Sequence, residues 1–257
     1  MRKLVIIITG VALLGAPVCI WGTTFGSLVS SFESPGAWPM GMSYKPGTLY
    51  ISTFSGRTVW RTTTTGSIIN YHPHDIGYPV GMTVGTVRGV TYYWLVSRSG
   101  GYVYRFIDNS STIDGSFAVP GEDSWGVSFV DASHMYYSAY SSKIIYLLEP
   151  MTGSIYTSYA VDINPGDMAY DPEGYLWVAD PHRERRHVYK CTTTGSALAS
   201  FVAVAHGHAH GCAYDGEYVW IGASDPDNGK YNILQFNVHE YPAVIPSSVG
   251  KIRALYR

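Results

Sequence analysis

Histidines gather in a few short segments of this 257-residue chain. The densest is residues 206–210, in which His206, His208 and His210 recur at every second position. In an extended segment this spacing puts the three side chains on one side. With a carboxylate they could bind zinc or another divalent metal ion. His210 could instead act as a general base oriented by Asp167, or the segment could be a solvated loop without a ligand, and the sequence leaves these three interpretations open.

Other polar segments carry side chains suited to recognition. Residues 72–75 read His-Pro-His-Asp, residues 180–187 combine arginines with histidines, and residues 225–228 read Asp-Pro-Asp-Asn. Imidazole, guanidinium and carboxylate groups can bind ligands through charge and hydrogen bonds, and an indole can stack on a sugar or pack between neighbouring elements. The candidate ligand-binding residues are Trp125, Asp167, His182, Arg183, His72, His74 and Asp225.

A sequence repeat indicates which secondary-structure elements position these residues. The pair Gly-Ser followed by a short apolar run recurs at Gly26, Gly66, Gly115, Gly153 and Gly195. The intervals are near forty residues, which is typical of propeller blades or helical repeats. The chain is rich in Tyr, Thr, Val, Ser and Gly and has no long stretch with helical periodicity, so strands are favoured. Each unit contains four short apolar runs, as in one blade of a β-propeller.

The ends of the repeat predict how the ring closes. The first Gly-Ser segment, residues 26–32, precedes the first complete unit, and the last unit ends at residues 233–236 without such a segment. Pairing these two segments removes the free edge that an open array would expose. We therefore expect an all-β fold: a five-bladed β-propeller of four-stranded antiparallel blades, closed by the N-terminal strand.

The motifs of the fourth unit indicate a family. Residues 168–180 (MAYDPEGYLWVAD) and 187–190 (HVYK) resemble blades of the NHL, SMP-30–gluconolactonase and streptogramin-lyase group. The similarity extends over most of residues 26–238. It implies a propeller that serves either as a binding protein or as a lactonase- or lyase-like enzyme, because such blades occur in both.

Two residues depart from the repeat at the start of the innermost strand. The third position of this strand is Gly in four units and Asp167 in the fourth unit, whereas the second position holds His210 in the fifth. Strand alternation places the His-rich connections on one face of the propeller, where ligands of propellers usually bind. We expect Asp167 and His210 to lie at the mouth of the central channel, and they are the catalytic candidates if the protein is an enzyme.

The termini differ in composition from the repeat. Residues 1–22 combine Arg2 and Lys3 with an apolar run at residues 4–14, the pattern of a signal peptide, although a retained anchor would read similarly. The propeller is expected over residues 23–238, and residues 239–257 form a tail with a basic end. That tail could be a strap across the propeller or a segment for self-assembly. The predicted location is extracellular or periplasmic.

The amino-acid composition limits the classes of function that the protein could have. The net charge is −2 and no basic stripe is present, so nucleic acid is not an expected partner. Once the leader is cleaved, the chain has no expected contact with a membrane. Our first prediction is a secreted module that binds a small molecule, glycan or protein through its His- and aromatic-rich face. The alternatives are a secreted lactonase- or lyase-like enzyme and a structural protein of an extracellular assembly.

Overall fold

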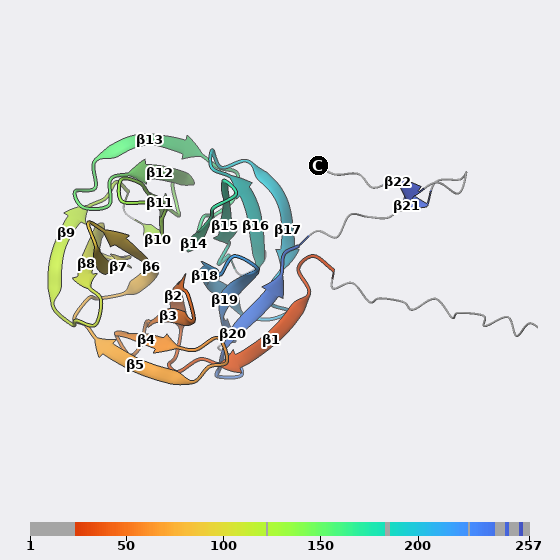
Figure 1. Cartoon of the computed structure of the whole chain (residues 1–257), viewed down its shortest axis with the longest axis horizontal. Coiled ribbons are helices and arrows are strands. Elements are labelled where there is room, and N and C mark those ends of the chain that lie inside the picture. The colour runs from red at the N-terminus through yellow and green to blue at the C-terminus, as the bar shows by residue number, and fades with distance from the viewer. Residues whose placement is uncertain are drawn as a thin grey trace, which may run out of the picture.

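A computed structural model of the protein describes residues 24–121, 123–182, 186–225 and 227–239, and two short strands at 245–246 and 252–253. Within these residues the chain is all-β, and five four-stranded antiparallel sheets surround a common axis as the blades of a propeller (Figure 1). The fold and the blade number predicted from the repeat are therefore confirmed. No helix of the described residues is long and apolar enough to cross a bilayer.

Each blade runs from an innermost strand beside the axis to an outermost strand on the circumference (Figure 1). Blade 1 consists of β2 (Pro39–Lys45), β3 (Thr48–Thr53), β4 (Thr58–Thr62) and β5 (Ile68–Pro73). Blade 2 consists of β6 (Pro79–Val87), β7 (Val90–Ser97), β8 (Tyr102–Ile107) and β9 (Ile113–Ala118). Blade 3 consists of β10 (Ser124–Phe129), β11 (Met135–Ala139), β12 (Ile144–Leu148) and β13 (Ile155–Ala160). Blade 4 consists of β14 (Met168–Asp171), β15 (Tyr175–Ala179), β16 (His187–Thr192) and β17 (Ala197–Val202).

Blade 5 joins the two ends of the propeller. It consists of β18 (His208–Tyr214), β19 (Tyr218–Asp225), β20 (Lys230–Asn237) and, on the outside, the N-terminal strand β1 (Leu28–Glu33). Strand β1 runs antiparallel to β20, with Phe32 opposite Ile233 (Figure 1). The predicted closure is confirmed, and it pairs the edge of β20 that would otherwise be free.

Aromatic side chains fill the space between neighbouring blades. The second strand of every blade has a large, almost fully buried ring at the same position: Tyr50, Trp94, Tyr136, Trp177 and Trp220. Each such ring removes roughly 150–250 Å² of surface from water, so these five positions hold much of the apolar core. In blade 4 this ring belongs to the run Leu176–Val178, whose three residues are all buried because the strand is covered on both faces.

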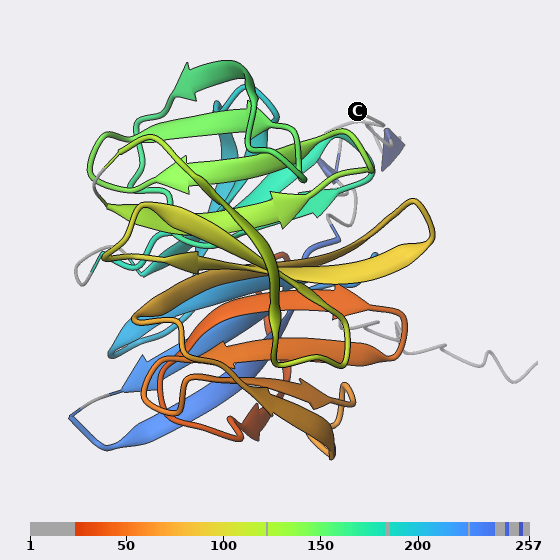
Figure 2. The same cartoon turned by 90° about the vertical axis from the view of Figure 1, so that its left-hand side faces the viewer.

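The connections between strands lie on two opposite faces of the disc (Figure 2). In blades 1 to 3 the residue before the innermost strand accepts a backbone hydrogen bond from the residue that follows the second strand, as in the bond from Arg98 N to Tyr78 O (3.0 Å). These two connections therefore lie on the same face, which we call the loop face. The opposite face, which carries the turns between the first and second and between the third and fourth strands of a blade, is called the turn face.

The termini lie largely outside the described residues. The predicted signal peptide, residues 1–22, is among the residues that are not described, and it stays a prediction. Of the tail, His239 and the two-residue strands β21 (Ile245–Pro246) and β22 (Ile252–Arg253) are described, and the two strands pair with each other. The roles proposed for the tail also stay predictions.

Candidate functional site

Glycines let the innermost strands meet at the axis. A Cβ atom added to Gly41 would lie 2.5 Å from the backbone nitrogen of Met82, and one added to Gly126 would lie 2.2 Å from Gly166 O. Such distances exclude any side chain. The Gly column predicted from the repeat is thus explained by close backbone contact, and Asp167 is the single member of the column with a side chain.

The Asp167 carboxylate lies on the axis and bonds to the backbone of other blades. It is fully buried, and its Oδ2 accepts hydrogen bonds from Met42 N at 2.8 Å and Cys212 N at 3.1 Å. The N–H groups of Val127 and Met168 also favour the charged form of this carboxylate, although its Oδ1 has no hydrogen-bond partner. Complete burial raises the pKa of Asp167 well above its usual value, although the four N–H groups act in the opposite direction. The hydrogen bonds of this side chain therefore link blade 4 to blades 1 and 5.

A second polar layer lies next to Asp167 along the axis. In blades 1 to 3 a hydroxyl of the innermost strand accepts a hydrogen bond from a backbone N–H of the following blade. The pairs are Ser43 with Val84 (3.0 Å), Thr83 with Phe129 (2.9 Å) and Ser128 with Tyr170 (2.7 Å). The corresponding residues in blades 4 and 5 are Ala169 and Ala213. The hydroxyls satisfy backbone groups that would otherwise be buried without a partner.

His210 lies on β18 near the loop-face end of the axis. The ring is 5% exposed, its Nε2 lies 3.0 Å from Ser224 Oγ, and it packs against Trp38 with 6.0 Å between ring centroids. Burial, with smaller effects of His208 and Arg98, lowers the pKa of His210 to about 3. The imidazole is therefore neutral at physiological pH.

The two catalytic candidates use different partners. No hydrogen bond joins Asp167 to His210, although both are described, because the carboxylate faces backbone N–H groups and the imidazole faces Ser224. A general base needs a second group that orients it toward a substrate. His210 is therefore paired with the Ser224 hydroxyl, and Asp167 is paired with backbone N–H groups of other blades.

The three imidazoles of residues 206–210 are not gathered around one point. His208 Nδ1 lies 3.1 Å from Pro181 O, and His210 is bonded to Ser224, whereas His206 lines a separate pocket. In the parts of the chain that the structure describes, no group of three or more His, Cys, Asp or Glu side chains could hold a metal ion. As placed, these residues do not fit a metal ligand set.

The remaining candidates are spread over blades 1 to 4. His72 lies on the outermost strand β5, and His74 is buried, with a pKa lowered to about 4 chiefly by burial. Trp125 is 5% exposed and lies under the Arg98 guanidinium, 4.7 Å from its ring centroid. His182 is half-buried and donates its backbone N–H to Asp180 Oδ1. Arg183 lies outside the described residues, so its predicted role is not addressed by the structure.

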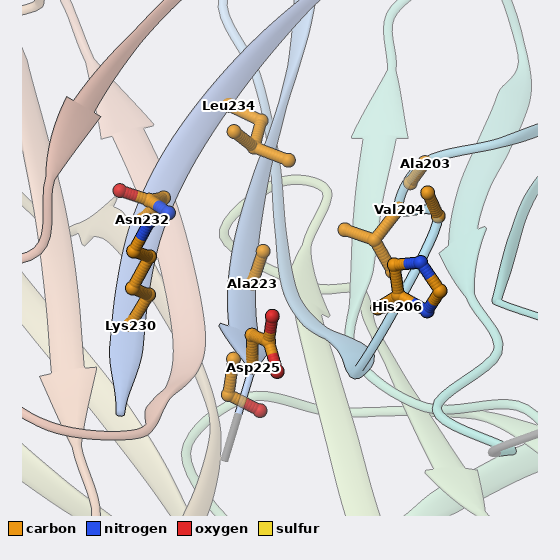
Figure 3. A pocket seen from close by; sticks show the side chains of 10 residues that line it. Ala203, Val204, His206, Ala223, Asp225, Lys230, Asn232 and Leu234 are labelled. Carbon is orange, nitrogen blue, oxygen red and sulfur yellow. The ribbon is translucent and has the colours of Figure 1, made fainter. Parts of the chain in front are cut away.

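Asp225 and His206 meet at a pocket on the loop face (Figure 3). The pocket has a volume of about 290 Å³ and lies between the β17–β18 connection and strands β19 and β20. It is lined by Ala203, Val204, Ala205, His206, Ala223, Ser224, Asp225, Lys230, Asn232 and Leu234. The sequence analysis named Asp225 and His206 as candidates but missed Lys230, Asn232 and Leu234. These three residues alternate along β20, which places them on one face of the strand, and this spacing was the signal in the sequence.

Charged groups of both signs surround this pocket. Asp225 Oδ2 accepts a hydrogen bond from Asn228 Nδ2 at 2.7 Å, and this bond is the main cause that lowers the pKa of Asp225. The carboxylate is therefore ionised at neutral pH. Lys230 stands opposite Asp225 in the β19–β20 ladder and supplies an ammonium group. Ala223, Val204 and Leu234 form apolar parts of the wall (Figure 3).

Comparison with known proteins gives matches in structure only. No protein-family model matches the sequence, and no curated protein matches it. Glutaminyl cyclase from Myxococcus xanthus superposes with a TM-score of 0.64 at 11% identity, covering 84% of this chain and 98% of that one. The shared feature is the β-propeller fold.

Two further propellers support the same conclusion. Regucalcin, a calcium-binding protein from Agrobacterium tumefaciens, superposes with a TM-score of 0.54 at 11% identity and covers 86% of this chain and 98% of its own. The PQQ-bound aldose sugar dehydrogenase from Streptomyces coelicolor has a TM-score of 0.51 at 15% identity, with 83% and 98% covered. The resemblance to SMP-30-like propellers is confirmed as a likeness of fold, and at these identities it assigns no activity.

Proposed function

We propose that the protein is a secreted β-propeller binding module that takes a small polar ligand in the pocket between the β17–β18 connection and blade 5. One observation carries the proposal: an ionised carboxylate, an ammonium group and an imidazole surround the same pocket of about 290 Å³. Small-molecule sites are typically concave, with apolar walls and a few polar groups that orient the ligand.

The chemistry of the lining indicates the type of ligand. Asp225 accepts hydrogen bonds and attracts a cationic group, whereas Lys230 attracts an anionic group and donates hydrogen bonds. Asn232 can do both, and Leu234 and Val204 offer apolar contact. A molecule of amino-acid size that carries both an amine and a carboxylate satisfies these groups together.

Binding is better supported than catalysis by Asp167 and His210. The Asp167 carboxylate is fully buried and already bonds to the N–H groups of Met42 and Cys212, and His210 is neutral and almost fully buried. In the proposed site, by contrast, Lys230 and His206 are exposed. A ligand can therefore reach them without a rearrangement of the blades.

The test is a binding measurement with the twenty free L-amino acids as probes, by calorimetry on the purified protein. We expect at least one of them to bind, and Asp225→Asn or Lys230→Met to weaken it about tenfold or more, since a hydrogen bond to a charged group contributes roughly 1.5–3 kcal/mol. Asp227→Asn, which changes an exposed neighbour outside the pocket lining, is the matched control. If no amino acid binds, or if all three variants bind alike, the pocket is not this kind of site.

Two parts of the proposal have their own measurements. Secretion rests on Arg2, Lys3 and the apolar run at 4–14, and it predicts a mature protein that begins near Thr23. Intact mass of exported protein checks this, and a mass that retains Met1 speaks for an anchor. Metal analysis of the purified protein checks the divalent-metal interpretation of His206, His208 and His210.

A further inference from the structure

A small pocket lies on the axis of the propeller, on the turn-face side of Asp167. Its volume is about 80 Å³, and the innermost strands of all five blades contribute to its lining. The lining combines buried residues such as Ser43 and Ala213 with half-buried ones such as Tyr44 and Tyr214. Among the described residues that line it, none carries a charged side chain. The pocket therefore suits a neutral polar group better than an ion.

Two backbone N–H groups of neighbouring blades face this pocket. In an antiparallel pair, N–H groups point alternately toward the partner strand and away from it. Met42 N donates to Asp167 rather than to β3, so Tyr44 N, two residues later in the same register, also points away from β3 toward the axis. Cys212 N likewise donates to Asp167, which places Tyr214 N on the axial side of β18.

The hydroxyl layer supplies no acceptor to these two N–H groups. At the equivalent position in blades 2 to 4 the N–H donates to a hydroxyl of the preceding blade, as Tyr170 N does to Ser128 Oγ at 2.7 Å. Ala169 and Ala213 stand where the two remaining hydroxyls would be. Within the described residues, neither N–H donates to a side chain or to a connection between strands. Donors in a protein interior are rarely left without a partner, so this pair points to a bound acceptor.

Asp167 shows what such a pair of donors can bind. One oxygen of its carboxylate, Oδ2, accepts hydrogen bonds from Met42 N at 2.8 Å and from Cys212 N at 3.1 Å. Tyr44 and Tyr214 follow these two residues by two positions on the same strands, so their N–H groups are the next donors along the axis toward the turn face. A single oxygen atom of a ligand can bind to both of them in the same way.

We propose that this pocket binds the primary carboxamide group of a small molecule, whose oxygen accepts hydrogen bonds from Tyr44 N and Tyr214 N. The C=O groups of these two residues face the axis as well, because the N–H and C=O of one residue point the same way in an antiparallel ladder. They can accept bonds from the amide NH₂. A primary carboxamide carries both donors and acceptors without a charge. The site shares no residue with the pocket lined by Asp225 and Lys230.

The test is a chemical-shift titration of the isotope-labelled protein with acetamide, acetone and acetate, which have similar shapes. We expect acetamide to shift the backbone amide signals of Tyr44 and Tyr214 and to bind at about millimolar concentrations, because so small a ligand makes few contacts. Acetone lacks the donors and should bind at least about threefold more weakly. Acetate brings an uncompensated charge into the pocket and should bind at least about tenfold more weakly.

Variants that complete the hydroxyl layer test the site itself. Ala213→Ser and Ala169→Ser place a hydroxyl beside Tyr44 N and Tyr214 N, as in the other blades. The double variant should bind acetamide at least about tenfold more weakly, because its own hydroxyls occupy both donors, and it should unfold at a higher temperature. Ala179→Ser is the matched control, since it adds a hydroxyl at a buried position outside the lining where blades 1 and 3 already carry serine.

A second control separates this inference from the proposed function. Asp225→Asn changes the other pocket and should leave the acetamide affinity as it is in the native protein. The inference is overturned if acetamide does not shift the Tyr44 and Tyr214 signals, which would mean that water alone fills the pocket. It is also overturned if acetate binds as tightly as acetamide, or if the double variant binds acetamide as the native protein does.

Discussion

Two carboxylates in adjacent blades show how differently one side chain can be used in this propeller. Asp167 of blade 4 is fully buried on the axis and is surrounded by backbone N–H groups of four blades. Asp225 of blade 5 lies at the rim of the loop face, where it borders a pocket with Lys230 and His206. Asp167 breaks the pattern of the repeat and Asp225 breaks none, yet only Asp225 is placed where a ligand can reach it. A residue that departs from a repeat has a role that the other units lack. Whether that role is structural or ligand-binding depends on whether the side chain is buried or accessible.

The largest expected effect concerns Asp167. Asp167→Ala leaves the N–H groups of Met42 and Cys212 at the axis without their acceptor, and a buried unsatisfied donor costs about 1–3 kcal/mol. We expect the free energy of unfolding to fall by about 4 kcal/mol, and Asp167→Asn, which keeps one carbonyl oxygen, to lose about half as much. Urea denaturation measures both. Equal stability of Asp167→Ala and Asp225→Ala would remove the distinction between axis and rim.

The second effect is a pH dependence that originates near the axis. The pKa of His210 is about 3 in the folded protein and about 6.5 in the unfolded chain. Between these values the unfolded chain binds a proton that the folded protein does not, so the stability is complete above pH 6.5 and decreases as the pH falls. One histidine contributes about 1.4 kcal/mol per pH unit at full slope, so the loss between pH 6.5 and 4.5 is about 2 kcal/mol.

The variant His210→Gln isolates this contribution. The difference in unfolding free energy between the native protein and His210→Gln should shrink as the pH falls from 6.5 to 4.5 and stay constant above pH 7. Because His74 and Asp167 are present in both proteins, their own titrations cancel in the difference. A difference that does not change with pH would mean that His210 is accessible to protons in the folded state.

A smaller effect is expected in the hydroxyl layer. Ser128→Ala removes the acceptor of the Tyr170 N–H and should cost about 1 kcal/mol. Blades 4 and 5 already carry Ala169 and Ala213 at this position, so the propeller tolerates the change in shape. Denaturant titration of Ser128→Ala checks the value. A loss as large as that of Asp167→Ala would indicate that the two polar layers cannot be treated separately.

The smallest effect is expected at the rim. Asp225→Asn keeps the shape of a side chain that borders solvent, and surface substitutions usually change stability by about 0.5 kcal/mol or less. The unfolding free energy should therefore stay within that margin while ligand binding weakens about tenfold or more. Calorimetric and denaturation measurements on the same preparation test both statements. A marked destabilisation would show that Asp225 holds the β19–β20 hairpin together rather than serving the pocket.

The sequence predicts the fold better than the site, for physical reasons. Blade number and closure follow from counting, because each Gly-Ser segment marks one strand and an unpaired strand edge is unfavourable. The Gly column likewise predicts close backbone contact. The direction of the Asp167 carboxylate does not follow, because it depends on N–H groups from four separate blades that meet only in three dimensions.

The rim is harder to predict than the axis. Lys230 and Asn232 lie on an ordinary strand, and their role depends on how the β17–β18 connection passes over blade 5. Tyr78 is more difficult still, because a residue before proline is expected to be extended, whereas this one has a positive φ. Local rules fail at the residues whose conformation is set by contacts across blades.

The pairing of β1 with β20 has a consequence for the order of events during synthesis. The two strands are separated by nearly the whole propeller, since Glu33 pairs with Asn232. At a translation rate of about 5–20 residues per second, β1 waits roughly 10–40 s for its partner. Four blades can form while the nascent chain is still growing, but the fifth cannot. The ring can close only after β20 has left the ribosome, so a chain truncated before β20 leaves β1 without its partner strand.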